Sequence, residues 1–279
     1  MSYVIVMDSC GERTEEMKKD SRIVSAPLTM QVDEHFFVDD ESFDQLDFLA
    51  KVAASPNCPS SACPSPDYYK KAFDCGVDRA YAVTLSAELS GSCNSAMLAK
   101  KLMQEEKPEM KIHVFKSRSA SIGETLITRK IQECEKAGMD FDSVVETVEN
   151  YIEGQNTYFV LENLETLRKN GRLSNLKAFV ATALKIKPVM HATPEGTIAQ
   201  LDQARGMNKA LVKLVNYLVE EVENPEEKVL AISHCNNPER GRMVRDAILE
   251  CIEVKDVILE NAAGLTTMYA NDGGIIAVI

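Results

Sequence analysis

Short apolar runs alternate along the chain with longer stretches in which apolar residues recur every three or four positions. Short runs are typical of buried strands, and they occur at Tyr3–Met7, Ala80–Leu85, Ile112–Phe115, Tyr158–Leu161, Val229–Ile232 and Ile275–Ile279. The longer stretches are typical of amphipathic helices, and they occur at Ser95–Gln104, Glu124–Ala137, Asp142–Ile152, Asn208–Val222 and Pro238–Cys251. Strands that alternate with helices predict an α/β fold in which mainly parallel sheets are flanked by helices.

Two segments of turn-forming residues interrupt this pattern. Ser55–Pro66 contains four of the ten prolines, which predicts an ordered loop. Asn170 and Gly171 follow a helical run and are typical of a helix end, and we expect a new helix over Leu173–Leu184. A boundary near Gln155 divides the chain into two α/β domains, residues 1–155 and 156–279, whose loops can meet at the interface.

The chain has a formal net charge of −12, from 31 Lys and Arg against 43 Asp and Glu. Binding to DNA, RNA or an anionic membrane needs net or clustered positive charge, so this balance argues against all three as main partners. A small anionic ligand needs only a local cation, so the net negative charge does not argue against one. No apolar run approaches the length of a membrane-spanning helix, so we expect no stable insertion into a membrane.

The first residues, MSYVIVMDSCGER, lack the basic and long apolar segments of a secretory signal. None of the eight cysteines forms a CxxC pair, the spacing typical of zinc sites. We therefore expect a cytoplasmic protein with reduced thiols and no metal site.

Three serine-bearing loops follow predicted strands, at residues 8–11, 86–92 and 117–121. In an open α/β sheet, ligands bind beyond the carboxyl ends of the strands. Ser90, Gly91 and Ser92 also open a helix, where free backbone N–H groups and hydroxyls suit a carboxylate or a phosphate. Plain capping of that helix by Ser90 or Ser92 is the alternative interpretation.

Asp8 follows the first strand and could serve as a metal ligand or a nucleophile, although a hydrogen-bonding role between loops is the simpler interpretation. The chain has no HExxH, Walker, GxGxxG or GxSxG motif. Its four histidines, His35, His113, His191 and His234, stand in no recognisable triad. A hydrolase or phosphotransferase that uses Asp8, Ser90 and one histidine is therefore an alternative, not the leading hypothesis.

Arg172 follows the Asn-Gly turn and is an informative cation in an acidic chain. A guanidinium suits bidentate binding of a carboxylate, but an arginine in this position also commonly fixes its own loop. Twelve methionines and the segment Leu176–Leu184 offer apolar lining for a long ligand, or simply core. Asp39, Asp40 and Glu41 form an acidic turn that we interpret as a solvated loop.

Several segments, in order and spacing, resemble the DegV family of bacterial fatty-acid-binding proteins. Leu89-Ser90-Gly91-Ser92-Cys93-Asn94-Ser95-Ala96 resembles the family segment L-S-G-T-Y-Q-S-A, and Ser60-Ser61-Ala62-Cys63-Pro64-Ser65-Pro66 resembles K-T-S-Q-P-S-P. The segments Leu164–Leu173 and Leu184–Pro188 resemble L-x-x-L-x-K-G-G-R-I and L-N-I-K-P. Val4–Ser9, Ala26–Leu28 and Phe37–Asp39 resemble the opening strand and turn, the V-P-L segment and a hairpin of the family. The resemblance covers nearly the whole chain.

The resemblance implies two α/β domains with a long-chain fatty acid, such as palmitate, in an apolar tunnel between them and no other cofactor. It further implies a non-catalytic subunit that presents the fatty-acid carboxylate to an ATP-dependent fatty-acid kinase, which makes acyl phosphate for phospholipid synthesis. By position, Ser61 and Ser90 would donate hydrogen bonds to the carboxylate beside the amides of Gly91 and Ser92, and Arg172 would offset its charge or contact the kinase.

Three positions depart from the family pattern. Ala62 removes a hydroxyl, and Lys116 stands before Ser117 and Arg118 where an aspartate is usual. Tyr269 falls about where the family tends to have a histidine, and a phenol donates a hydrogen bond without being cationic near neutral pH. A lipid-binding sensor or regulator that serves no kinase is therefore a further alternative.

Overall fold

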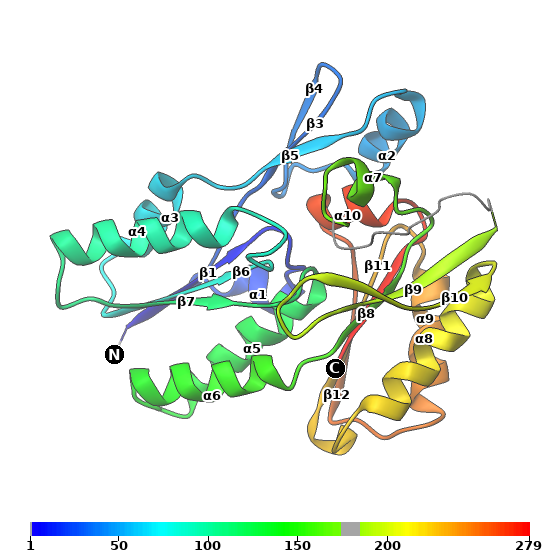
Figure 1. Ribbon diagram of the computed structural model, residues 1–279. Coiled ribbons are helices and arrows are strands. Elements are labelled where there is room, and N and C mark those ends of the chain that lie inside the picture. Colours follow the sequence, from blue (N-terminus) through cyan, green and yellow to red (C-terminus); the bar gives the residue numbers. More distant parts are fainter. Residues whose placement is uncertain (1, 174–184) are drawn as a thin grey trace.

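The computed structural model describes residues 2–173 and 185–279, and their strands form three sheets (Figure 1). The first sheet has the order β2-β1-β6-β7 and consists of β1 (Tyr3–Asp8), β2 (Ile23–Ala26), β6 (Arg79–Thr84) and β7 (Lys111–Lys116). All of its neighbouring strands are parallel, as the sequence pattern predicts. The expected domain boundary near Gln155 falls between this sheet and the next.

The second sheet has the order β10-β9-β8-β13-β11-β12. Its strands are β8 (Thr157–Val160), β9 (Ile186–Ala192), β10 (Ile198–Arg205), β11 (Val229–His234), β12 (Asp256–Asn261) and β13 (Ile275–Val278). Only β11 and β12 pair in parallel, and the other four pairings are antiparallel. The expectation of a mainly parallel second sheet is therefore wrong. A turn as short as the one between β9 and β10 can join only antiparallel neighbours, because a parallel pair needs a long crossover.

A small antiparallel sheet, β4-β3-β5, stands apart from the other two and is formed by β3 (Thr29–Val32), β4 (His35–Val38) and β5 (Ser60–Ala62). β5 lies within Ser55–Pro66, so the predicted loop contains a short strand. Such a strand is too short to give a periodic signal, and its pairing with β3 is what defines it.

Ten α-helices and one 3-10 turn lie in the described residues. They are α1 (Glu15–Lys19), α2 (Gln45–Ala54), α3 (Pro66–Phe73), α4 (Ser92–Glu106), α5 (Ile122–Lys136), α6 (Phe141–Glu153), α7 (Glu165–Lys169), α8 (Met207–Glu221), η1 (Pro225–Glu227), α9 (Pro238–Leu249) and α10 (Gly264–Ala270). The helix expected over Leu173–Leu184 lies almost entirely outside the described residues. Among residues 2–173 and 185–279, no helix is long and apolar enough to span a membrane.

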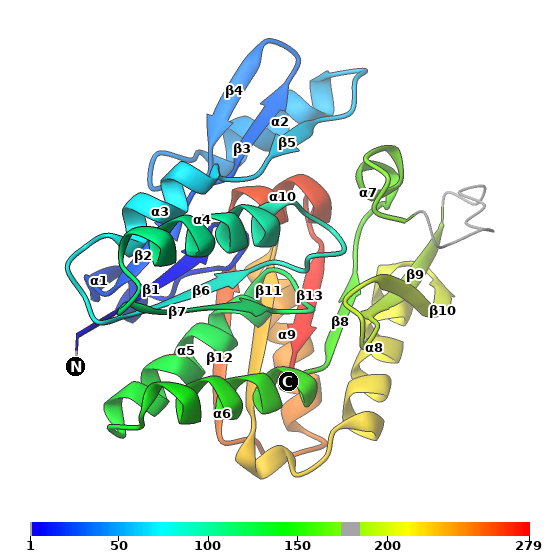
Figure 2. The ribbon, with the colours of Figure 1, turned by 60° about the vertical axis from the view of Figure 1, so that its left-hand side comes forward.

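The helices cover the sheets in layers (Figure 2). Alternate residues of the first sheet pack against α3 and α4 on one face and against α5 and α6 on the other. α8 and α9 cover one face of the second sheet. α5 also packs its Ile122 and Leu126 against β11, β12 and β13. It therefore joins the two larger sheets through a shared apolar core.

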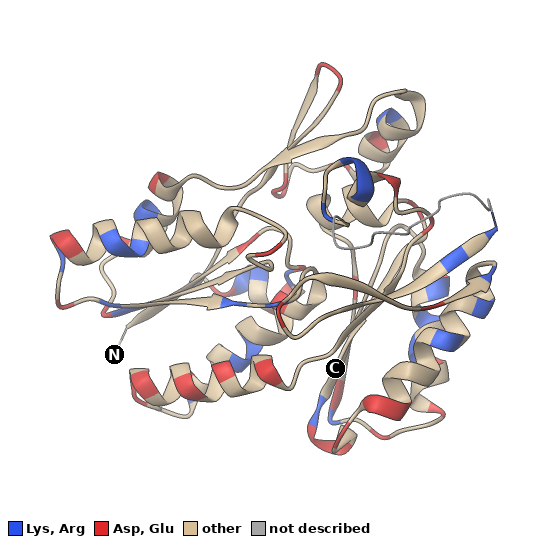
Figure 3. Ribbon diagram, viewed as in Figure 1, with Lys and Arg blue, Asp and Glu red and all other residues tan. Residues whose placement is uncertain are grey.

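Charge is distributed unevenly over this architecture (Figure 3). Acidic residues follow one another along α6, whereas basic residues occur on the hairpin β9–β10 and on α8. α10 and α2 pack with the small sheet, and this unit closes over the ends of β1 and β6. The site described next lies beneath that unit.

Candidate functional site

A pocket of about 260 Å³ with mixed polar and apolar lining lies where β5, the start of α4, α10 and the segment after α7 meet. We call it the outer pocket, and its lining residues are Leu28, Ser61, Ala62, Cys63, Leu85, Leu89, Ser90, Gly91, Arg172, Leu265 and Tyr269. Five of the six residues predicted to bind ligand, all except Ser92, are therefore brought together in one place. They come from positions up to 208 residues apart, 269 minus 61, so only the tertiary structure could make them neighbours.

A second cavity of about 90 Å³ adjoins the outer pocket. We call it the inner cavity, and its lining residues are Cys10, Leu85, Leu89, Arg118, Ser119, Ala120, Ser121, Thr157, Phe159, Leu161, Leu167, Arg172, Ala192, Gly196, Thr197, Ile198, Leu265, Thr266, Tyr269, Ala270 and Ile276. Leu85, Leu89, Arg172, Leu265 and Tyr269 line both spaces. The smallest cavity that holds one water molecule measures roughly 10–15 Å³. The inner cavity is therefore much larger than a packing defect.

Most polar groups of the inner cavity bond to the protein itself. The Ser119 and Thr157 hydroxyls lie 2.6 Å apart, and the Thr266 hydroxyl donates to the Cys10 carbonyl at 3.0 Å. The remaining lining is largely aliphatic. A cavity whose polar groups are already paired offers little to a polar ligand, and it favours an apolar one.

Ser90 and Ser92 have different surroundings although they are two residues apart. Ser90 lines the outer pocket, and its hydroxyl accepts a hydrogen bond from the Ser92 amide at 3.2 Å. Ser92 is fully buried, and its hydroxyl donates to Asp8 at 2.6 Å and bonds with the Tyr69 hydroxyl at 2.7 Å. The first turn of α4 thus directs the Ser92 side chain into the core, and the predicted contribution of Ser92 through its backbone amide stays a prediction.

Arg172 lies at the junction of the outer pocket and the inner cavity. It follows Gly171, whose positive φ of 75° lets the chain reverse after α7. Its Nε donates to the Leu89 carbonyl at 3.1 Å, and its Nη1 donates to the Asn170 carbonyl. A guanidinium has five N–H groups, and the bonds to other described residues use two of them. The loop-fixing interpretation of Arg172 is confirmed. Its place in the lining of both spaces leaves carboxylate binding as a prediction.

Tyr269 projects from α10 into the same junction and is partly buried by its neighbours. Burial raises the pKa of its phenol, while the nearby Arg172 and a hydrogen bond with Ser61 act in the opposite direction. The phenol is therefore neutral near pH 7 and can donate a hydrogen bond. At this position it can act as a donor, but it adds no positive charge.

Asp39 holds the helix that carries Tyr269. Its carboxylate accepts hydrogen bonds from the amides of Gly264 at 2.6 Å and Leu265 at 2.8 Å, at the start of α10. It is 5% exposed, so the interpretation of Asp39 as part of a solvated loop is wrong. Burial raises its pKa to about 6 despite these two donors. Sequence alone shows an acidic turn and cannot show that another segment covers it.

Glu12 links the two larger sheets. Its carboxylate accepts from the hydroxyls of Ser121 at 2.8 Å and Ser233 at 3.0 Å and from the Ala263 amide at 3.3 Å. The side chain is almost completely buried, and this burial raises its pKa to about 7. The loop before α5, the end of β11 and the segment before α10 therefore converge on one titratable group.

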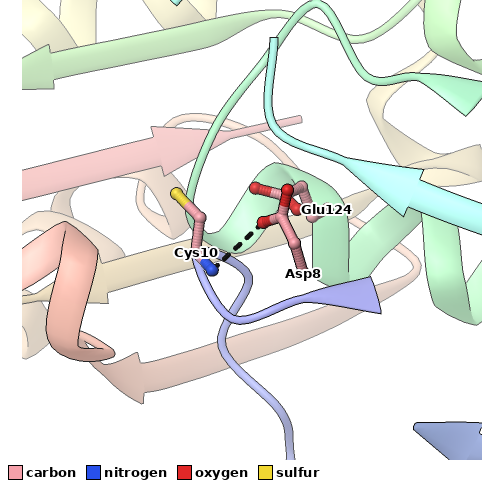
Figure 4. A group of neighbouring side chains, drawn as sticks. All are labelled: Asp8, Cys10 and Glu124. Atoms are coloured by element: carbon pink, nitrogen blue, oxygen red, sulfur yellow. Dashed lines mark hydrogen bonds between the residues drawn. The ribbon is translucent and has the colours of Figure 1, made fainter. Parts of the chain in front are cut away.

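Asp8, Cys10 and Glu124 form a fully buried group at the end of β1 (Figure 4). Asp8 accepts from the Leu85 amide at 3.0 Å and the Cys10 amide at 3.2 Å, in addition to Ser92, which confirms the hydrogen-bonding role predicted for it. Burial and the neighbouring Asp8 hold the pKa of Glu124 well above its usual range. This shift favours the protonated, neutral form of Glu124 beside Asp8. A metal could bind there only after Glu124 lost that proton, so we assign the group to the fold.

None of the four histidines is among the described residues that line the two spaces. His113 contacts Glu149 at 2.9 Å on the far side of the first sheet, and the His234 Nδ1 accepts from the Asn237 amide at 3.3 Å. Asp8 also lies outside the lining of both spaces. The arrangement does not assemble the Asp8, Ser90 and histidine constellation that a hydrolase would need.

Residues 2–278 match the model of a protein family described as uncharacterised protein, DegV family. The chain belongs to the DegV family. A DegV domain-containing protein of Streptococcus gordonii is 35% identical over 278 residues, which cover 99% of this chain and 98% of that relative. The resemblance drawn from the motifs is thereby confirmed.

Two solved structures are similar to this chain over its whole length. A DegV-family protein from Ruminococcus gnavus, refined with vaccenic acid, is 53% identical with a TM-score of 0.97, and the match covers 100% of this chain and 99% of that one. The Fatty Acid Kinase (Fak) B3 protein of Streptococcus pneumoniae, loaded with linoleic acid, is 33% identical with a TM-score of 0.89 and the same coverage. The two-domain α/β fold is confirmed, and these two neighbours hold fatty acids.

The sequence interpretation missed two kinds of residue at the site. Leu85, Leu89 and Leu265 connect the two spaces, but a leucine at the end of a strand or the start of a helix gives no signal beyond ordinary core. Glu12 and Glu124 are buried carboxyl groups next to the site. The apolar and hydroxyl neighbours of Glu124 along α5, all buried, are the one local sign that could have indicated its burial.

Proposed function

We propose that the protein binds one long-chain fatty acid and presents its carboxylate to an ATP-dependent fatty-acid kinase, without catalysing the reaction itself. The acyl chain occupies the inner cavity, and the carboxylate lies in the outer pocket. The observation that supports this is the continuity of the two spaces: an apolar cavity opens, past Arg172 and Tyr269, into a pocket of hydrogen-bond donors.

The donor set of the outer pocket suits a carboxylate. Arg172 supplies positive charge, and Ser61, Ser90 and Tyr269 each supply a hydroxyl. Hydrogen bonds to a charged group contribute about 1.5–3 kcal/mol each when they are well made. The start of α4 at Gly91 adds the positive end of a helix dipole, which favours an anion.

Most of the affinity comes from the chain. Each buried CH₂ contributes about 0.8 kcal/mol, so a chain of roughly sixteen carbons gains on the order of 12 kcal/mol before the cost of association is subtracted. The polar contacts therefore fix the position of the ligand more than its affinity. A ligand held mainly by its chain suits a protein that presents the carboxylate of the fatty acid to a partner enzyme.

The kinase role draws on the relatedness to the Streptococcus pneumoniae Fak B3 protein. The outer pocket is bordered by the exposed residues Ala62, Cys63 and Gly91, so a partner can reach the carboxylate without entering the inner cavity. A sensor that binds lipid but serves no kinase would share the same cavity and differ only in this last step.

Native mass spectrometry of the purified protein, followed by organic extraction, tests the binding step. We expect an added mass of one fatty acid per chain that is lost on denaturation. A protein that stays free of ligand after incubation with palmitate, vaccenate and linoleate would refute the proposal.

A coupled assay tests the presentation step. The loaded protein is mixed with ATP and the ATP-binding subunit of a bacterial fatty-acid kinase, and acyl phosphate is measured. Ser90→Ala should lower the rate, whereas Ser60→Ala, an exposed serine outside the pocket, should not. Ligand binding without acyl-phosphate formation would favour the sensor.

A further inference from the structure

The turn between β9 and β10 crosses from the second sheet to the loops of the first sheet, as Figures 1 and 2 both show. The Ser86 hydroxyl, on the loop after β6, donates to the Gly196 carbonyl in this turn at 2.7 Å. Ser86 is 1% exposed, so this bond is shielded from water. The turn is therefore fastened to the opposite domain, not left free in solution.

Gly196 brings the two backbones into direct contact. Its φ is +88°, and a Cβ there would lie 2.5 Å from the Ser86 Oγ and 2.9 Å from the Arg118 Cα. Real Cβ atoms do not approach so closely, so only glycine fits without displacing the Arg118 backbone. No methylene chain can pass between the turn and the loop that carries Arg118. The contact between Gly196 and the Arg118 backbone therefore forms a wall that closes this side of the space between the two segments.

This wall bounds the inner cavity. Ala192, Gly196 and Thr197 line the inner cavity but not the outer pocket. The five residues that the two spaces share mark the other end, where the head group is placed in the proposed function. The turn therefore forms part of the wall of the inner cavity that the outer pocket does not reach.

We propose that the β9–β10 turn ends the acyl cavity and that Ala192 sets how many carbons of a fatty acid fit. This inference rests on the proposed function and specifies its substrate. Ala192 pairs with Ile198 in the hairpin, and both side chains line the cavity. Because Ala192 is small and the wall behind it is closed, the size of its side chain determines the length of acyl chain that the cavity accepts.

Substitution Ala192→Leu tests this assignment. Leucine adds three carbons to the wall, so the preferred fatty acid should shorten by about three carbons. An eighteen-carbon chain then leaves about three methylenes unburied, which corresponds to roughly 60-fold weaker binding. Ala192→Val, which adds two carbons, should give a smaller shift in the same direction and serves if the leucine variant does not fold.

Ala199→Leu is the matched control, because Ala199 follows Ile198 on β10 and faces the other side of the hairpin. Each variant is incubated with an equimolar mixture of saturated fatty acids of twelve to twenty carbons, and the bound mass is read by native mass spectrometry. A shift in Ala192→Leu but not in Ala199→Leu supports the assignment.

Equal profiles for the wild type and both Ala192 variants would overturn it, as would equal shifts in the leucine variant and the control. A wild-type protein that binds no fatty acid would instead refute the proposed function itself. The two failures are therefore distinguishable.

Discussion

Replacement of Glu12 by glutamine should change how the stability of the protein depends on pH. Burial raises the pKa of Glu12 from 4.5 to about 7. Between pH 4.5 and about pH 7, Glu12 therefore keeps its proton in the folded protein and loses it in the unfolded chain. Stability contributed by this group is present below pH 4.5 and is lost as the pH rises through 7. Glutamine keeps the shape of the side chain and removes the titration.

The size of the effect follows from the shift. One pKa unit corresponds to about 1.4 kcal/mol, so the free energy of unfolding of Glu12→Gln should gain roughly 3 kcal/mol relative to the wild type between pH 4.5 and pH 8. Urea denaturation at several pH values measures this difference. Glu16→Gln, at an exposed position four residues away, serves as the control and should run parallel to the wild type.

Parallel curves for Glu12→Gln and the wild type would refute the reasoning. They would mean that the donors of Ser121, Ser233 and Ala263 stabilise the carboxylate enough to cancel the effect of burial. The experiment compares the free energy of unfolding of Glu12→Gln with that of the wild type at each pH. Every other carboxylate titrates in the same way in both proteins, so the difference reports Glu12 alone.

Further predictions concern the outer pocket. Arg172→Gln should lower fatty-acid-dependent acyl-phosphate formation about 10-fold to 100-fold, because a hydrogen bond from a charged donor is worth about 1.5–3 kcal/mol; a change below 3-fold in the coupled assay would contradict this. Ser61→Ala should weaken fatty-acid binding by about 10-fold to 100-fold, because its hydroxyl donates to a charged carboxylate, as titration calorimetry can measure. Fatty acid should protect Cys63, an exposed thiol lining the pocket, from a maleimide reagent but leave the exposed Cys75 reactive; equal labelling with and without ligand, read by peptide mass mapping, would place the head group elsewhere.

Local patterns in the sequence identified six of the thirteen strands in the described residues. The six apolar runs correspond to β1, β6, β7, β8, β11 and β13, and the predicted start of α4 at Ser90–Ser92 agrees with the structure within two residues. The reason is that side-chain periodicity and turn residues act over a few neighbouring positions. The binding motifs containing Ser61, Ser90 and Arg172 were also local, and each could be read by itself.

Only the tertiary structure decided the direction of strand pairing, the exposure of each polar side chain and the joining of the two spaces. The antiparallel second sheet depends on how β13 inserts between β8 and β11, which no local pattern encodes. Ser92 and Asp39 look solvent-accessible in the sequence, yet a helix turn buries one and α10 covers the other. Burial sets the pKa of a carboxylate and the direction of a hydroxyl, and burial is a property of residues distant in the chain.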